Sequence, residues 1–238
     1  MKTLQWMLTE RCNYQCRHCY LHGSHPSDST EKAVAHPDTQ TLLSCMDHMR
    51  QEGIRDVILT GGEPLLRKDL WMIMRALTER GIRISRIITN ASLLTAAHLE
   101  MLRVLGQEPV FNISFDGAGG MHGYLRRHPQ AEESVQKAFT MCREYGFETA
   151  ADMTLFRGNL PYLRESIRTL EELGCFFPAG ADSHVLHGDR RRTAFNRPHR
   201  LAGGFLHLSD RFPRRAYAGT GRYCCQAYVH KKASGRCA

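Results

Sequence analysis

The strongest constraint on this chain is a group of three cysteines near its N-terminus. Cys12, Cys16 and Cys19 stand in the run Cys-Asn-Tyr-Gln-Cys-Arg-His-Cys-Tyr. Thiolates spaced three and then two residues apart in one short loop can converge on a compact metal centre, and three of them leave one iron of a four-iron cluster without a protein ligand. An open metal position is where a catalytic site admits substrate or cofactor. The loop therefore predicts a cluster that takes part in chemistry.

A second motif, Gly61-Gly62-Glu63-Pro64, stands at the end of the next expected strand. The spacing Cys-x3-Cys-x2-Cys, with the aromatic His18 before the third cysteine, resembles the cluster loop of the radical S-adenosylmethionine (radical SAM) enzymes. The Gly-Gly-Glu-Pro motif resembles the second motif of that family. The cysteine spacing also admits another interpretation, a structural zinc site in which the three thiolates are joined by His18 or His22.

Composition favours one intracellular unit. A chain of 238 residues and 27.1 kDa can bury the core of a single α/β domain. The apolar start is interrupted by Gln5 and ends at Thr9-Glu10-Arg11, so neither a membrane span nor a signal peptide is expected. An odd number of cysteines, nine, fits metal ligation in a reducing compartment better than a disulfide framework. We therefore expect a cytoplasmic protein without a membrane partner.

Hydrophobic periodicity predicts strict alternation of strands and helices over residues 1–175. Strands are expected over 4–8, 57–60, 82–89, 110–116 and 149–156, and helices over 38–52, 69–81, 95–105, 132–145 and 159–174, the last burying Leu163, Ile167 and Leu170. Such alternation implies a parallel sheet with right-handed crossovers. The predicted fold class is α/β, a partial (β/α) barrel of five to six parallel strand-helix units. The resemblance makes this the radical SAM core, with six units.

Functional side chains of such barrels gather where strands end. The resemblance implies that the cluster ligands are Cys12, Cys16 and Cys19. It also implies that S-adenosylmethionine is bound by residues at the other strand ends: Gly61, Gly62, Glu63, Asn90, Ser114 and Arg126. The glycines would let the backbone approach the cofactor. Glu63 would accept a hydrogen bond from the methionyl ammonium group, and Asn90 and Ser114 would bind the ribose hydroxyls or the methionyl moiety.

The remaining assignment, Arg126, comes from the segment His122-Gly123-Tyr124-Leu125-Arg126-Arg127. This segment resembles the family pattern His-Asp-x-x-Arg-Gly, in which the arginine pairs with the methionyl carboxylate. It departs from the pattern at its second and last positions, so the register of Arg126 against Arg127 stays open. Asn90 and Ser114 also have an ordinary interpretation as turn or capping residues, and Asp116-Gly117 as a turn.

The resemblance implies an enzyme with two cofactors, a [4Fe–4S] cluster and S-adenosylmethionine. Reductive cleavage of the sulfonium would give a 5′-deoxyadenosyl radical that takes hydrogen from an unidentified substrate. The motifs are most similar to enzymes that mature ribosomal peptides, sulfatases or tetrapyrroles, so a peptide or protein is one candidate substrate, and a flavodoxin or ferredoxin is the expected electron donor. Cys224, Cys225 and Cys237 do not reproduce the spacing of an auxiliary cluster.

The pattern ends near residue 175. Residues 176–238 hold twelve Lys and Arg against three Asp, net +9, whereas residues 1–175 have net charge −1. No sixth strand-helix unit is legible there, so we predict an irregular basic tail that is non-native through frameshift or truncation, or else a disordered linker. An incomplete barrel would expose an edge on its first or fifth strand. Alternative functions are a non-catalytic zinc- or nucleic-acid-binding protein, the latter not favoured because the tail lacks periodicity, or an inactive truncated radical SAM protein.

Overall fold

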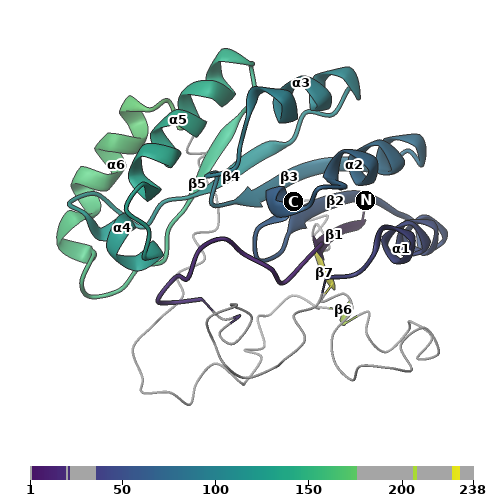
Figure 1. Cartoon of the computed structure of the whole chain (residues 1–238), viewed down its shortest axis with the longest axis horizontal. Coiled ribbons are helices and arrows are strands. Elements are labelled where there is room, and N and C mark those ends of the chain that lie inside the picture. The colour runs from purple at the N-terminus through teal and green to yellow at the C-terminus, as the bar shows by residue number, and fades with distance from the viewer. Residues whose placement is uncertain (1, 20, 22–35, 176–205, 208–226, 231–238) are drawn as a thin grey trace, which may run out of the picture.

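Five parallel strands form the centre of the molecule. The computed structural model describes residues 2–19, 21, 36–175, 206–207 and 227–230. The strands are β1 (Lys2–Met7), β2 (Ile54–Thr60), β3 (Arg83–Thr89), β4 (Val110–Ser114) and β5 (Thr149–Asp152). They stand in the order β5-β4-β3-β2-β1 with every neighbouring pair parallel (Figure 1). The predicted α/β fold with its alternating parallel units is confirmed.

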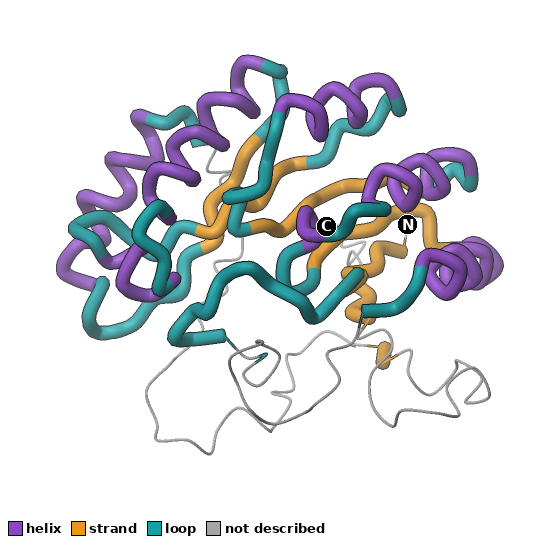
Figure 2. The backbone as a smooth tube through the Cα atoms, in the orientation of Figure 1, coloured by secondary structure: helices purple, strands orange, loops and turns teal. Residues whose placement is uncertain are grey.

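Helices connect these strands and cover the sheet. They are α1 (Thr39–Gln51), α2 (Leu70–Glu79), α3 (Ala96–Val104), α4 (Met121–Arg126), α5 (Ala131–Glu144) and α6 (Leu163–Glu172), with 3-10 turns η1 (Pro64–Leu66) and η2 (Leu160–Tyr162). Figure 2 shows the loop after β1 running past the ends of the strands toward α4. The short helix α4 was not predicted, because six residues interrupted by Gly123 give no legible apolar stripe. No helix in the described residues is long and apolar enough to cross a membrane.

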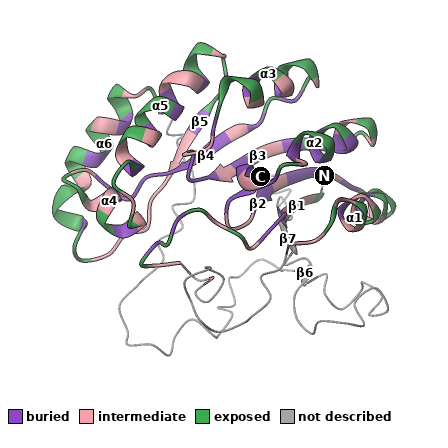
Figure 3. Cartoon of the chain, viewed as in Figure 1, coloured by how far each residue is buried: buried purple, intermediate pink, exposed green. Residues whose placement is uncertain are grey.

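The core lies between the sheet and the helices. On β1 and β4 alternate side chains join this core, as Leu4 and Trp6 do on β1 and Phe111 and Ile113 on β4. Register shifts between β1 and β2 and between β2 and β3 interrupt the alternation there. The predicted apolar stripe of α2, from Leu70 to Leu77, is buried. Figure 3 shows the outer helix surfaces exposed over a buried sheet. One continuous core therefore fixes the positions of all five strand ends.

Helix α6 differs from its prediction. Leu170 is buried, but Ile167, expected inward, is 40% exposed, and Ser166 is fully buried in its place. The Ser166 hydroxyl donates to the Tyr162 carbonyl (2.7 Å) and accepts from the Ala118 amide (2.9 Å). The bond to Tyr162 lies within the first turn of the helix, whereas the bond to Ala118 reaches the loop after β4 and favours the rotation that turns Ser166 inward. Strand β5 also ends earlier than predicted, at Asp152.

Two short segments of the tail are described as strands, β6 (Leu206–His207) and β7 (Ala227–His230). Strand β7 pairs antiparallel with β1, and β6 pairs with β7. Of the two strands predicted to expose an edge, β1 is therefore covered. Within the described residues β5 pairs with β4 alone. The rest of the predicted tail, including Cys224, Cys225 and Cys237, lies outside the described residues.

Candidate active site

The cysteine loop and the Gly-Gly-Glu-Pro motif are packed backbone to backbone. The Gly62 amide donates to the Thr9 carbonyl (2.6 Å), and the Glu63 amide donates to the Arg11 carbonyl (2.8 Å). A Cβ on Gly61 would lie 2.4 Å from the Thr9 carbonyl oxygen, and one on Gly62 would lie 2.3 Å from that of Arg11. Real Cβ atoms do not approach so closely, so both positions require glycine. The glycines were expected to let the backbone approach the cofactor. In the structure they let the backbone at the start of the cysteine loop approach.

The three cysteines share a small cluster separate from the main core. Cys16 is buried with Tyr14 and Ala131, and Cys12 and Cys19 pack against this group. Burial raises the pKa of all three thiols, that of Cys12 to about 11. Tyr14 also stacks on His128, with ring centroids 4.5 Å apart. The loop is thus held in place by packing.

The zinc interpretation of the cysteine loop named His18 or His22 as the fourth ligand. In the described part of the chain no three His, Cys, Asp or Glu side chains are grouped to hold one metal ion. Zinc requires its ligands around one atom, whereas each cysteine of an iron–sulfur cluster binds a different iron. In the structure His18 Nε2 lies 3.9 Å from Asp116 Oδ2, and His22 lies outside the described residues.

The ends of β2 and β3 meet the Cys12 side of the loop. The Asn90 side-chain amide donates to the Asn13 side-chain oxygen (3.0 Å) and lies 3.8 Å from the Cys12 sulfur. The Tyr14 amide lies 3.4 Å from the same sulfur. N–H donors directed at a sulfur suit a thiolate that carries negative charge as a metal ligand. Asn90 therefore lies next to the sulfur of a predicted cluster ligand. The alternative interpretation, a turn residue, does not account for this contact.

Glu63 is enclosed at this strand end. Its side chain is fully buried, and its Oε1 accepts from the Leu65 amide (3.0 Å) and the Thr89 hydroxyl (2.8 Å). Its Oε2 accepts from the Asn90 amide (2.8 Å). Burial raises the pKa of this carboxyl to about 7, against the lowering effect of these hydrogen bonds. The carboxylate is therefore held mainly by neutral donors.

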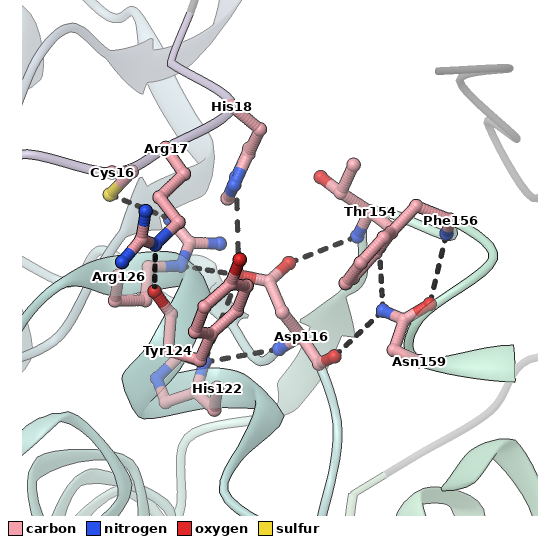
Figure 4. Close-up of polar contacts among 10 residues, drawn as sticks. All are labelled: Cys16, Arg17, His18, Asp116, His122, Tyr124, Arg126, Thr154, Phe156 and Asn159. Carbon is pink, nitrogen blue, oxygen red and sulfur yellow. Dashed lines mark hydrogen bonds and ion pairs between the residues drawn. The ribbon is translucent and has the colours of Figure 1, made fainter. Parts of the chain in front are cut away.

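The ends of β4 and β5 meet the Cys16 side of the loop, and Asp116 is the centre of this contact (Figure 4). Its Oδ2 accepts from Arg126 Nε at 2.6 Å, and Arg126 Nη1 lies 3.8 Å from the Cys16 sulfur. The Arg17 amide donates to the Leu125 carbonyl (2.8 Å). Helix α4 is thus tied to the cysteine loop by both side chain and backbone.

Sequence reasoning placed Asp116 at the end of the fourth strand, with Ser114, but assigned it no role. Its interpretation as a mere turn is wrong, because the side chain is fully buried and also accepts from the Thr154 amide (3.1 Å). The only signal in the sequence was its place after a strand. The structure also brings Arg126, rather than Arg127, to the cysteine loop: Arg127 stands just past α4 in the left-handed region (φ 53°). Ser114 ends β4, buried, and pairs in register with Asp152.

A row of polar side chains crosses the sheet below these strand ends. Arg86 Nη1 donates to the Asn112 side-chain oxygen (2.9 Å), and Asn112 Nδ2 donates to Asp152 Oδ1 (3.0 Å). Their chain neighbours Ile87 and Ile113 belong to the helix-packed core. Successive side chains of a strand point to opposite faces, so the row lies on the face away from the helices. No motif in the sequence indicated it.

Comparison with known proteins gives a consistent result. The model of the Radical SAM superfamily matches residues 6–170. The AdoMet-dependent heme synthase of Oleidesulfovibrio alaskensis is 29% identical over 174 residues, which cover 73% of this chain and 43% of that protein. The chain thus spans less than half of that relative's length.

Solved structures with a similar fold include anSMEcpe with bound AdoMet and the Kp18Cys peptide, at TM-score 0.61 and 17% identity, covering 74% of this chain and 49% of that one. Streptococcus suis SuiB bound to the precursor peptide SuiA has TM-score 0.59 and 16% identity, with 73% and 37% covered. The family match confirms the expected enzyme class and its cofactor pair, a [4Fe–4S] cluster and S-adenosylmethionine. Because that match spans most of the described chain, the protein belongs to the radical SAM superfamily.

Proposed function

We propose that Cys12, Cys16 and Cys19 hold the [4Fe–4S] cluster and that residues 1–175 are the catalytic core of an enzyme that cleaves S-adenosylmethionine reductively. The observation that supports this most directly is the pair of N–H donors beside the loop sulfurs. Asn90 lies next to the Cys12 sulfur and Arg126 next to the Cys16 sulfur. When bound, the cluster supplies one electron to the sulfonium, releasing methionine and a 5′-deoxyadenosyl radical that takes a hydrogen atom from the substrate. A reduced flavodoxin or ferredoxin would supply that electron.

The chain's own residues would bind and orient S-adenosylmethionine. Gly61, Gly62 and Glu63 form the wall beside Cys12, where a buried carboxyl with a raised pKa suits the methionyl ammonium group as partner. Arg126 would pair with the methionyl carboxylate. Asn90 and Ser114, at the ends of β3 and β4, would bind the ribose hydroxyls or the methionyl moiety.

A peptide is the substrate class that the described surface suits best. The row Arg86, Asn112 and Asp152 offers a cation, an amide and a carboxylate side by side on the face away from the helices. Such groups complement backbone amides and charged side chains of an extended peptide. SuiB and anSMEcpe, which share the fold, were solved with peptides bound.

The test of the cofactor assignment is anaerobic reconstitution with iron and sulfide. The protein should take up a four-iron cluster, give an electron resonance signal on reduction, and form 5′-deoxyadenosine from S-adenosylmethionine without added substrate. Cys45→Ala, in α1, is the matched control for a cysteine outside the loop. Tightly bound zinc with no iron uptake would contradict the proposal.

The substrate proposal is tested on the reconstituted protein. Asn112→Leu removes the centre of the polar row and should abolish stimulation of 5′-deoxyadenosine formation by a peptide, while the slow cleavage without peptide is unchanged.

A tetrapyrrole is the second candidate, because the heme synthase has higher identity to this chain than the two peptide-bound structures have. Stimulation of wild-type cleavage by a tetrapyrrole, but not by peptides, would decide for it.

A further inference from the structure

We propose, on the basis of the function above, that Asp116 is a positioning residue for the cluster: it holds the Arg126 guanidinium on the Cys16 sulfur, so that the cluster is more easily reduced. Asp116 acts on the cysteine loop through Arg126, which contacts both the carboxylate and the sulfur. The proposal gives a function to the buried carboxylate that the cofactor assignments leave without one.

The Asp116 carboxylate is fixed from two directions. Oδ2 accepts from Arg126 Nε, and Oδ1 accepts from the backbone amide of Thr154 after β5. The residue's own backbone is held as well, because its carbonyl accepts from Asn159 Nδ2 (2.8 Å) and its amide donates to His122 Nδ1 (3.1 Å). The carboxylate therefore has one orientation (Figure 4).

The Arg126 guanidinium contacts the Asp116 carboxylate with one nitrogen and the Cys16 sulfur with another. Its Nε donates to Asp116, and its Nη1 lies 3.8 Å from Cys16 Sγ. Its side chain is only 12% exposed, so little water competes for these donors. The planar guanidinium links the two contacts rigidly, which a lysine ammonium on a flexible stem cannot do.

Other ionisable groups face Asp116 at longer range. His18 Nε2 and His122 Nδ1 each lie 3.9 Å from Oδ2. His122 Nδ1 already accepts the Asp116 amide, so the neutral ring does not supply a competing cation. Arg126, at 2.6 Å, lies closer to Oδ2 than either histidine and also reaches the Cys16 sulfur at 3.8 Å, so it is the group that links the carboxylate to the cysteine loop.

The consequence for electron transfer follows from charge. Reduction adds one electron to the cluster, and hydrogen bonds to its sulfurs raise the reduction potential because they stabilise the added negative charge. A charge-assisted donor is the stronger kind. If Arg126 swings away, this stabilisation is lost and the cluster becomes harder to reduce.

The test compares reduction potentials of the reconstituted cluster in the absence of S-adenosylmethionine, by titration with dithionite followed by electron resonance. Asp116→Asn is decisive because two effects have opposite signs. Removing a nearby negative charge alone would raise the potential. Asn has one oxygen and one NH2 group in place of two carboxylate oxygens. If its oxygen faces Thr154, Arg126 is released, and if it faces Arg126, a neutral acceptor replaces the charged one. In both orientations Arg126 is held less firmly, and a weaker Arg126 contact with the sulfur lowers the potential. We expect a shift to more negative potential.

A second variant, Arg126→Lys, keeps the charge but not the linked contacts, and it should also shift the potential to a more negative value. Arg75→Gln, which breaks an exposed ion pair on α2, is the charge-loss control and should leave the potential unchanged. An unchanged or raised potential in both Asp116→Asn and Arg126→Lys, with full iron content, overturns the positioning role. A wild-type protein that takes up no cluster instead contradicts the proposed function.

Discussion

Two buried carboxylates stand on opposite sides of the cysteine loop and are stabilised in different ways. Glu63, at the end of β2, accepts from two backbone amides and one hydroxyl. Asp116, after β4, is paired with the Arg126 guanidinium at 2.6 Å. Both side chains are fully buried. Burial in the protein removes both carboxylates from water. Neutral hydrogen-bond donors stabilise Glu63, whereas a cation stabilises Asp116.

The difference indicates where a cationic ligand is needed. Asp116 already has its counter-charge within the protein, whereas burial raises the pKa of Glu63 to about 7. An ammonium group brought beside Glu63 would favour its ionised form. Under the proposed function, the side of β2 and β3 would therefore take the cationic end of S-adenosylmethionine, and the side of β4 its carboxylate through Arg126.

The largest expected effect concerns the sulfurs that join the two sides. Cys12→Ala and Cys16→Ala should each abolish the four-iron cluster. The loop supplies only three thiolates, and the cluster needs all of them as ligands. Iron and sulfide analysis with electron resonance after reconstitution measures the loss. A variant that retained the full iron content would show that its cysteine is not a ligand.

The next effect tests the ion pair on the Asp116 side. Arg126→Met leaves a buried charge without its partner and should lower the free energy of unfolding by about 3 to 5 kcal/mol. Urea unfolding of the apoprotein, followed by circular dichroism, measures it, with the exposed Arg75→Met as control. Adding Asp116→Asn to Arg126→Met should recover part of the loss. A double variant no more stable than the single one would show that an unpaired carboxylate is not the cause of the destabilisation.

Much of the fold and part of the site could be predicted from the sequence. The alternation of strands and helices, and the place of Gly61–Glu63 beside the cysteine loop, follow from apolar periodicity and from the rule that functional residues gather at strand ends. The physical role of the two glycines did not follow, because the carbonyls of Thr9 and Arg11 approach them only in the folded chain.

The role of Asp116 and the rotation of α6 did not follow from the sequence, for a related reason. Asp-Gly is a common turn signal, and nothing local reveals that Arg126 and Thr154 converge on this carboxylate. In α6, hydrophobicity placed Ile167 inward, but the Ser166 hydroxyl accepts from the Ala118 amide in the loop after β4, and this bond favours the observed rotation. Long-range hydrogen bonds of single polar residues leave no periodic pattern.

The pH dependence of the free energy of unfolding tests whether Glu63, unlike Asp116, lacks a cationic partner in the protein. Because the pKa of Glu63 is raised from 4.5 to about 7 in the folded protein, the folded state holds a proton that the unfolded chain releases. Its contribution to stability is therefore full below about pH 4.5 and declines as the pH rises to about 7. The stability difference between wild type and Glu63→Gln, from unfolding of the apoproteins, should fall across this window.

The difference between those two proteins isolates Glu63 from other groups. Burial lowers the pKa of His122 to about 4, so that residue contributes stability that is present at higher pH and lost as the pH falls. This opposite slope is common to both proteins and cancels. A stability difference that stays flat or rises between pH 4.5 and 7 would show that Glu63 stays ionised throughout.

The smallest expected loss of stability comes from removing one hydroxyl. It compares the Thr89 hydroxyl, which donates to Glu63, with the Thr154 backbone amide, which donates to Asp116. The Thr89 hydroxyl donates to Glu63 Oε1 and accepts from the Ala91 amide (2.9 Å). Thr89→Val keeps the shape but removes both bonds, leaving buried groups unsatisfied, and should lower the free energy of unfolding by about 1 to 3 kcal/mol. Thr154→Val is the matched control on the other side, since Asp116 accepts from the Thr154 backbone amide, which valine retains. Its unfolding free energy should stay within about 0.5 kcal/mol of wild type. Equal losses in the two variants would mean that the two carboxylates are not held by different kinds of donor.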